Sequence, residues 1–434
     1  MKLKIFGLLA VLLAFNFYLQ AQSAVTEMNI HGLRVIFKPS SKQTVSAYMF
    51  YKGGTSNYTP QEQGIESLTL SAATECGTGK YTKDAFKDMA DKYGIEVSGG
   101  SDYDYGYICM SCVKPYFNEG WTLFAEAVNH PIFNTQEFSL LQQKKISGLK
   151  SQESNPDNEL TKMTMLDAFK DTRYAIRPEG TVETVSTFKA EDAKNYYSKL
   201  LNVNRLTLVI VGNLSVQDVK QKVEAAFNKL PSAPVSVSLA TKATHIETNS
   251  LNIEKRMLAT NYIAGVMGAP AANDPSYEAY RLACMILYEK LFEEVRTKRN
   301  LSYAPSASLI SGVYPYTEIY VTTTKPKEAV SVMVDEIKRL SDGGFTETDL
   351  KNAKSKLATS YFMQNESTSS NARSLGVFDI RGSWKDQATL LDRINQVTLA
   401  QMQKVFTENA KGIKWNYLGD ETLADKEAFA KTVK

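Results

Sequence analysis

The order of predicted strands and helices runs through this chain twice, and that repetition constrains the fold more than any single motif. The first pass has alternating strands, helices and a closing apolar strand and helix at 33–37, 45–51, 64–75, 82–93, 103–113, 116–200, 206–213 and 215–229. The second pass has strands and helices at 259–267, 276–298, 305–324, 326–410 and 411–420. Residue identity between the passes is low, so the duplication is inferred from order and endings.

The repetition predicts the fold class. Strands followed by helices that cover one face are typical of α+β domains. A chain of 434 residues also exceeds what one ordinary core accommodates. We therefore expect two homologous domains, each a mostly antiparallel sheet with helices packed on one face. The expected domains are 22–230 and 251–434, joined by a polar, proline-containing linker at 231–250.

The N-terminus has the pattern of a secretory signal peptide over residues 1–21. Two lysines precede an apolar run at 5–19, and a small residue ends the segment. The alternative is a membrane anchor, because the run is near the short limit of a spanning helix. Asn16 and Gln20 interrupt the run and favour cleavage. We expect a periplasmic or otherwise exported protein without a stable membrane anchor.

Charge and cysteine content add two limits. Fifty Lys and Arg against 47 Asp and Glu, well mixed, give no reason to expect nucleic-acid binding. Cys109 and Cys112 lie on one predicted strand and point to opposite faces, so they are poorly placed to chelate a metal. Together with Cys76 and Cys284 they are interpreted as buried thiols, although export would permit a disulfide whose pairing the sequence does not give.

Several segments in order resemble the insulinase/pitrilysin metallopeptidases over nearly all of the mature chain. They are an opening strand, a glycine-containing approach to a helix, that helix with its closing Gly-Thr, and a domain end, at 29–35, 51–64, 64–78 and 206–231. In that family the helix carries the zinc motif His-x-x-Glu-His. The same positions here hold Ser67, Leu70 and Ser71.

The resemblance implies that the zinc site is degenerate. Two imidazoles and a carboxylate base are what a catalytic zinc of this type needs, and two hydroxyls and an alkyl group supply neither. The family's third ligand, a glutamate on a later helix, is represented by Asp167 on the helix predicted at 159–170, which by itself is explained as an ordinary helix residue. Glu66 and Glu75 flank the motif, but carboxylates alone make a poor zinc site. We expect no metal and no cofactor in this chain, and zinc only in a partner subunit.

The second half contains a segment, 291–303, that is similar to the family's substrate-binding signature. There an arginine ends a helix and a tyrosine seven residues later begins a strand; Arg296 and Tyr303 hold these positions. A guanidinium and a phenol can donate to an oxygen that becomes negative during peptide hydrolysis. From residue types alone, the favoured interpretation is that Arg296 pairs with Glu293 or Glu294 and that Tyr303 merely begins a strand, whereas the family context favours a substrate role.

The region 97–113 is a second candidate surface. Members of the family bind extended peptides along an exposed strand edge, through main-chain hydrogen bonds. Tyr103, Tyr105 and Tyr107 recur with the period of a strand. They can line a peptide channel or pack as ordinary sheet residues, and the sequence leaves both open.

Three functional hypotheses follow. The resemblance implies a non-catalytic, peptide-binding subunit of an exported zinc metallopeptidase, pairing with a separate zinc-bearing chain of the same fold. The alternative is a peptide-binding or scaffold protein with no role in proteolysis. A self-sufficient enzyme with unusual ligands would hold stoichiometric metal. The sequence does not separate a homodimer from a heterodimer.

Overall fold

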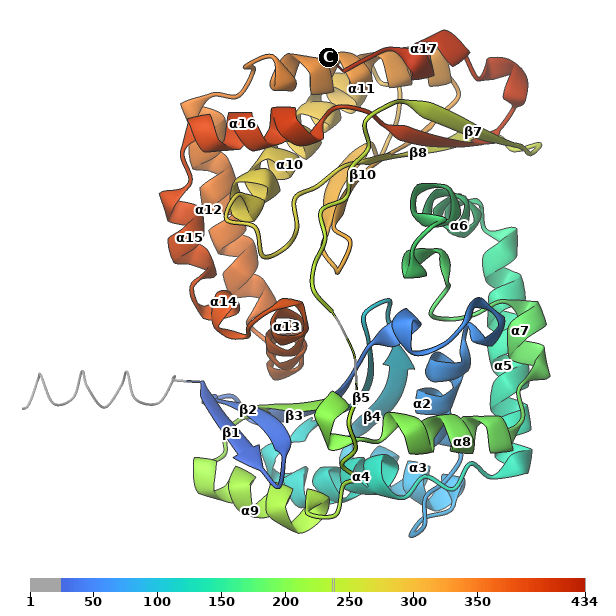
Figure 1. Ribbon diagram of the computed structural model, residues 1–434, viewed down its shortest axis with the longest axis vertical. Coiled ribbons are helices and arrows are strands. Elements are labelled where there is room, and N and C mark those ends of the chain that lie inside the picture. Colours follow the sequence, from blue (N-terminus) through green and yellow to red (C-terminus); the bar gives the residue numbers. More distant parts are fainter. Residues whose placement is uncertain (1–24, 236, 238, 434) are drawn as a thin grey trace, which may run out of the picture. The chain divides into compact units, whose positions relative to one another are not determined.

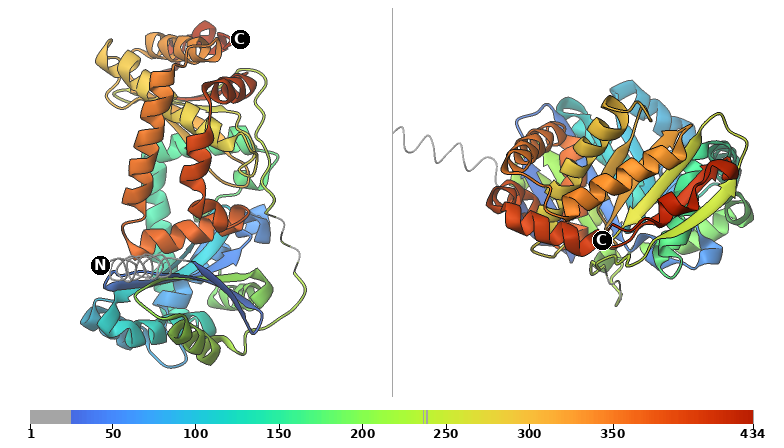
Figure 2. Two further views of the ribbon diagram at one scale, coloured as in Figure 1. Left: turned by 90° about the vertical axis from the view of Figure 1, so that its left-hand side faces the viewer. Right: turned by 90° about the horizontal axis from the view of Figure 1, so that it is seen from above.

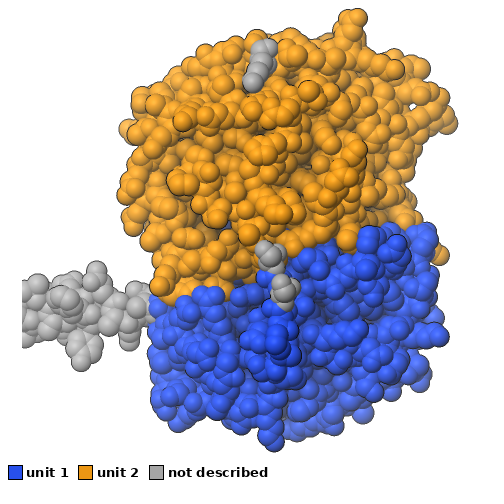
Figure 3. Space-filling view, in the orientation of Figure 1, with its two compact units in different colours: residues 1–145, 178–237, 364–377 blue, residues 146–177, 238–363, 378–434 orange. Residues whose placement is uncertain are grey.

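The computed structural model describes residues 25–235, 237 and 239–433. The predicted signal peptide, 1–21, lies outside the described residues. The chain forms two compact units that are each discontinuous in sequence (Figure 3). Unit 1 comprises the described parts of 1–145, 178–237 and 364–377, and unit 2 those of 146–177, 238–363 and 378–434. No helix in the described part of the chain is both long and apolar enough to cross a bilayer.

Unit 1 is built on a six-stranded sheet with the order β1-β2-β6-β3-β5-β4 (Figure 1). Its strands are β1 (Thr26–Ile30), β2 (Leu33–Pro39), β3 (Thr44–Lys52), β4 (Glu96–Ser101), β5 (Tyr105–Val113) and β6 (Leu206–Gly212). The pair β2–β6 is parallel and the other neighbours are antiparallel. β6 is buried along its whole length, as its continuous apolar sequence predicts.

Unit 2 is built on a five-stranded sheet with the order β7-β11-β8-β10-β9. Its strands are β7 (Ser250–Lys255), β8 (Asn261–Met267), β9 (Ser306–Ile310), β10 (Tyr316–Thr323) and β11 (Lys414–Gly419). The pair β7–β11 is parallel and the others are antiparallel, so the order and directions repeat those of β2-β6-β3-β5-β4. The predicted α+β class with two homologous halves is confirmed.

The helices follow the local signals of the sequence. Those of the first half are α2 (Ile65–Glu75), α3 (Lys83–Tyr93), α4 (Phe117–Asn129), α5 (Thr135–Ser154), α6 (Pro156–Phe169), α7 (Val182–Thr187), α8 (Ala190–Leu200) and α9 (Val216–Phe227). Thr82 caps the start of α3 by accepting from the Ala85 amide, and Gly94 ends it in the left-handed conformation. Ser215 starts α9 with a capping box.

The second half adds a corresponding set. It comprises α10 (Tyr277–Leu291), the π-helical turn η6 (Phe292–Thr297), α11 (Pro326–Ser341), α12 (Glu347–Gln364), α13 (Thr368–Arg381), α14 (Lys385–Ala388), α15 (Leu390–Gln396), α16 (Leu399–Asn409) and α17 (Lys426–Ala430). Figure 2 shows α11 and α10 side by side over the second sheet. A large apolar core joins them to β8, β10 and β11.

Each half of the sequence gives one helical segment to the unit built mainly by the other half. α6 lies in unit 2, where Leu160 and Met163 pack with Ala264 and Leu418. Residues 364–377 lie in unit 1. Leu418 and Ala264 are next in sequence to residues of the main core, to which α10 also contributes. Because successive residues of a strand point to opposite faces of the sheet, α6 covers the face opposite α10.

The segment that joins unit 1 is held by close packing and hydroxyl contacts to β3. A Cβ at Gly376 would lie 2.0 Å from the Phe50 ring, so only glycine permits this approach. The Thr368 hydroxyl lies 2.9 Å from the Ser46 hydroxyl. The compact units therefore differ from the contiguous ranges expected from sequence order.

Candidate functional site

The helix that corresponds to the zinc motif, α2, is packed against the β4–β5 hairpin of unit 1. Leu70 is fully buried, and a Cβ at Gly99 would lie 2.0 Å from the Leu70 carbonyl oxygen. The Ser71 hydroxyl donates to the Gly99 carbonyl at 3.0 Å. Ser67 is half-buried one turn earlier. Leu70 and Ser71, two of the three residues in the motif positions, therefore hold the helix against the hairpin.

Replacing Gly99 by alanine is expected to destabilise unit 1 by about 1–3 kcal/mol, because overpacking against backbone forces the chain to move. The matched control is Gly79→Ala, where a Cβ meets nothing closer than 3.5 Å. Urea unfolding of the two variants and the parent measures the difference. A Gly99→Ala variant as stable as Gly79→Ala would contradict the close packing.

A buried carboxylate, Glu66, occupies the first turn of α2. Its Oε2 accepts hydrogen bonds from the Asn57 amide at 2.8 Å and the Tyr196 hydroxyl at 2.6 Å. Arg205 donates to the Asn57 side-chain oxygen at 2.5 Å, and its positive charge favours the ionised form of Glu66. Glu66 Oε1 is buried and has no hydrogen-bond partner among the described residues. Burial raises the pKa of Glu66 to about 7, and the hydrogen bonds from Asn57 and Tyr196 partly offset that rise.

Asp167 belongs to unit 2, whereas Ser67, Leu70 and Ser71 belong to unit 1. Its carboxylate accepts from the Asn416 amide at 3.4 Å, and its main-chain carbonyl accepts from Lys414 Nζ at 3.0 Å. Both contacts fix α6 to β11. Within the described ranges, no three His, Cys, Asp or Glu side chains are grouped so that they could hold a metal ion.

Arg296 and Tyr303 lie together on the turn that follows α10. The Arg296 guanidinium carbon lies 4.1 Å from the centroid of the Tyr303 ring, a cation–π contact. It also lies 4.7 Å from the centroid of Phe292. Tyr303 is 78% exposed. Asn300, in the left-handed conformation at φ 49°, reverses the chain and brings the two side chains together.

The turn that carries Arg296 is a π-helix. Its widened backbone is marked by the Lys298 amide donating to the Glu293 carbonyl at 2.9 Å, five residues earlier. π-Helical turns are rare and occur frequently at functional sites. The sequence predicts one continuous helix over 276–298 and gives no signal for this local change.

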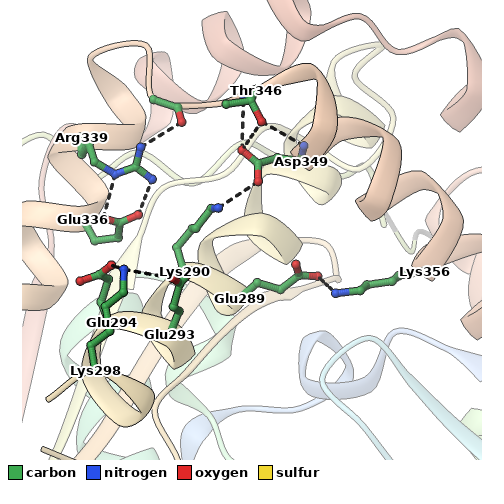
Figure 4. A network of polar contacts seen from close by, with 11 residues as sticks. Glu289, Lys290, Glu293, Glu294, Lys298, Glu336, Arg339, Thr346, Asp349 and Lys356 are labelled. Carbon is green, nitrogen blue, oxygen red and sulfur yellow. Dashed lines mark hydrogen bonds and ion pairs between the residues drawn. The ribbon is translucent and has the colours of Figure 1, made fainter. Parts of the chain in front are cut away.

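The acidic residues beside Arg296 are paired elsewhere, as Figure 4 shows. Lys298 Nζ lies 2.9 Å from Glu293 and 2.6 Å from Glu294. Arg299, which the figure does not label, forms a second ion pair with Glu294. Lys290 anchors the end of α10 to Asp349 of α12 at 2.9 Å. Within the part of the chain that the structure describes, Arg296 has no carboxylate partner. The alternative pairing of Arg296 with Glu293 or Glu294 is therefore absent.

β4 is the outer strand of the first sheet, and no described strand pairs with its free side. A groove of about 680 Å³ runs beside it, between β4, α3 and α5. Phe86, Ile95 and Leu141 are among its apolar lining residues, and Lys83, Lys87, Glu96, Glu137 and Lys144 are among its charged ones. An outer strand beside a groove is suited to bind an extended chain.

The three tyrosines of this region do not form one stripe. Tyr103 lies in the bend between β4 and β5, and Tyr105 and Tyr107 lie in β5. The Tyr105 ring packs edge-on against Phe50 at 5.3 Å between centroids, and Tyr107 lies 6.1 Å from Tyr48. Tyr105 and Tyr107 thus pack against β3, as the sheet-packing interpretation expects.

Comparison with known proteins shows which family and which proteins the chain resembles. Residues 187–357, which include Arg296 and Tyr303, match the family described as "Peptidase M16 inactive domain". A protein of Helicobacter pylori (strain ATCC 700392 / 26695), described as "Non-peptidase homolog YmxG", is 24% identical over 411 residues, which cover 91% of this chain and 93% of that protein. The chain is therefore similar to peptidase M16 proteins, and residues 187–357 match the domain of that family that is described as inactive. The resemblance to the insulinase/pitrilysin metallopeptidases is thereby confirmed.

Solved structures agree with this M16 assignment at the level of the fold. A crystal structure of a peptidase M16 inactive domain from Pseudomonas fluorescens has a TM-score of 0.79 and 18% identity, covering 92% of this chain and 98% of that one. The periplasmic protease PqqL from Escherichia coli has a TM-score of 0.74 and 16% identity, covering 92% of this chain and 45% of that one.

Proposed function

We propose that this M16 homologue is the non-catalytic, peptide-binding subunit of an exported peptidase and pairs with a separate, zinc-bearing chain of the same fold. The observation that carries the proposal is the Arg296–Tyr303 pair. The arginine has no carboxylate partner among the described residues, and the tyrosine is 78% exposed. A side-chain pair of this kind is free to contact a ligand.

The chemistry of the pair fits the carbonyl of a peptide bond. When water attacks that carbon, the carbonyl oxygen becomes an anion that fixed N–H and O–H donors stabilise. Arg296 offers several N–H groups, and Tyr303 offers its hydroxyl. The partner chain would supply the zinc and the activated water. This chain would orient the substrate and stabilise the developing charge.

The groove beside β4 supports a peptide ligand independently. A strand added to the free side of β4 would form main-chain hydrogen bonds that do not depend on the peptide sequence. The apolar side chains of Phe86, Ile95 and Leu141 offer contact area for alternate residues of such a strand. The mixed charges around them favour no single charge on the peptide.

Export is part of the proposal. The signal-peptide pattern at 1–21 supports it, and PqqL, whose structure resembles this fold, is described as periplasmic. Fractionation of native cells with an antibody to the chain would test export. Recovery only in the cytoplasm with residues 1–21 intact would contradict it.

Co-purification tests the subunit role. The chain is tagged at its C-terminus in its native host, and the proteins retained with it are identified and analysed for zinc. We expect one partner of similar size that carries zinc, and peptide cleavage by the pair but not by either chain alone. Chelator-sensitive cleavage by the isolated chain would contradict the proposal.

The second candidate is peptide binding without proteolysis. The groove beside β4 favours it, because all residues that line the groove belong to unit 1 and binding there needs no partner chain. In that case, the isolated chain binds extended peptides and no zinc-bearing protein is retained with it. The co-purification experiment therefore separates the two functions.

A further inference from the structure

A cavity of about 190 Å³ lies at the start of α10, and all of its lining residues belong to unit 2. Three arginines line it, Arg281, Arg381 and Arg393. Pro275, Tyr277 and Phe378 give it an apolar part. None of the roles described above uses this cavity.

One buried carboxylate holds two of these arginines in place. Glu278 is 7% exposed, and its Oε2 accepts from Arg281 Nε at 2.8 Å. Its Oε1 accepts from a terminal nitrogen of Arg393 at 3.0 Å. The Arg281 guanidinium also lies 5.3 Å from the centroid of the Tyr277 ring. Both guanidinium groups are therefore fixed before any ligand arrives.

Several guanidinium N–H groups in the cavity have no hydrogen-bond acceptor in the described part of the chain. In the described part of the chain, only Nε of Arg281 has an acceptor, so both terminal nitrogens are free. Arg381 donates from one nitrogen to the Ser311 carbonyl at 2.8 Å and has no carboxylate partner among the described residues. Buried or half-buried guanidinium donors favour an anionic acceptor.

The remaining acidic groups of the lining do not supply that acceptor. Asp274 accepts from the amide and the hydroxyl of Ser276, at 2.8 and 2.6 Å. Asp386 is 54% exposed and lies 3.6 Å from Arg393 rather than beside Arg281 or Arg381. The donors of Arg281 and Arg381 therefore stay available inside the cavity.

We propose that this cavity binds a carboxylate that ends a short apolar group, with the carboxylate between Arg281 and Arg381 and the apolar group against Phe378 and Pro275. A guanidinium binds a carboxylate through two parallel hydrogen bonds, which fits this donor set. The volume is below the roughly 300–1,000 Å³ of sites for larger ligands, so the ligand has about the size of one amino-acid residue. The carboxylate is that of a small free acid or of the last residue of a peptide.

Calorimetric titration of the isolated mature chain tests the site without the partner subunit, so its outcome is separate from that of the subunit proposal. The probes are N-acetyl-leucine, N-acetyl-leucinamide and a tripeptide that ends in leucine with a free carboxylate. We expect saturable binding of N-acetyl-leucine and at least about 10-fold weaker binding of the amide, because the charged acceptor is lost. Comparable binding of the tripeptide would assign the site to peptide ends, and its exclusion would assign it to small free acids.

Two substitutions at Arg381 and one control sharpen the test. Arg381→Gln retains a donor for the Ser311 carbonyl and is expected to weaken N-acetyl-leucine binding about 10-fold or more. Arg381→Lys keeps the charge but cannot form two parallel hydrogen bonds, so its affinity for N-acetyl-leucine is expected to lie between those of the parent and the glutamine variant. Lys385→Gln removes an exposed cation of α14 outside the lining and is expected to change binding less than about 2-fold. Equal binding of acid and amide, or equal effects of Arg381→Gln and Lys385→Gln, would overturn the proposal.

Discussion

Replacing Arg296 by alanine is expected to lower kcat/KM of the reconstituted pair by roughly 10²–10³-fold, the usual effect of removing one donor to the oxyanion. The stacked geometry carries this expectation: the guanidinium is held 4.1 Å from the centroid of Tyr303 and is not neutralised by the adjacent acids. If the contact is made mainly in the transition state, kcat falls more than KM rises. Initial rates of peptide cleavage over a range of substrate concentrations measure both.

Matched variants separate this role from general damage to the turn. Arg299→Ala removes a neighbouring arginine that is paired with Glu294, and it is expected to leave cleavage nearly unchanged. Tyr303→Phe keeps the ring under Arg296 and removes only the hydroxyl. The zinc content of the partner chain is expected to be the same in every case. A double substitution of Arg296 and Tyr303 that leaves turnover unchanged would refute the proposed substrate role.

The sequence predicts the elements that have strong local signals. The expected strand 206–213 corresponds to β6, Leu206–Gly212, because a short apolar run rich in β-branched residues is typical of a buried strand. The expected helix 215–229 corresponds to α9, whose start is fixed by the Ser215 capping box. β1 and β7 are absent from the prediction. Both are outer strands with partly exposed residues and weak apolar alternation.

Tertiary packing decides what the sequence leaves open. The apolar residues of α6 indicate a buried face but not which sheet covers it, and Leu160 and Met163 pack on the second sheet. Likewise, nothing local to residues 364–377 indicates that Gly376 packs on Phe50 in the first sheet. The exchange of these segments comes from contacts between residues far apart in the sequence.

The hydrogen-bond partners of buried carboxylates also depend on tertiary packing. The second residue of α2 and the second residue of α10 are both buried glutamates, Glu66 and Glu278. Their partners come from distant segments: Tyr196 is 130 residues from Glu66, and Arg393 is 115 residues from Glu278. The sequence therefore gives the carboxylates but not their environments. The family resemblance places the motif at Ser67, Leu70 and Ser71 and assigns no role to Glu66, which flanks it.

Glu66→Gln is expected to make unit 1 more stable at neutral and alkaline pH and to remove part of its pH dependence. Burial raises the pKa of Glu66 from an ordinary value of 4.5 to about 7, with hydrogen bonds from Asn57 and Tyr196 opposing the rise. Between these pH values the folded state keeps a proton that the unfolded state loses. The stability contributed by the protonated group is therefore complete below pH 4.5 and is lost as pH rises through 7. The difference of 2.5 pH units corresponds to about 3 kcal/mol.

Glutamine suits this test because its side-chain oxygen can still accept from Asn57 and Tyr196, while it carries no charge at any pH. The control is Glu75→Gln, which removes a carboxylate that is 44% exposed in the last turn of the same helix. Hydrogen exchange of the peptide that covers α2, measured in urea from pH 4.5 to pH 8.5 and corrected for intrinsic rates, follows unit 1 separately from unit 2. The stability of Glu66→Gln relative to the parent should increase by about 3 kcal/mol across this range, and that of Glu75→Gln should change far less. A constant difference between Glu66→Gln and the parent would mean that Glu66 stays ionised in the folded protein, with Arg205 and the two hydrogen-bond donors compensating for its burial.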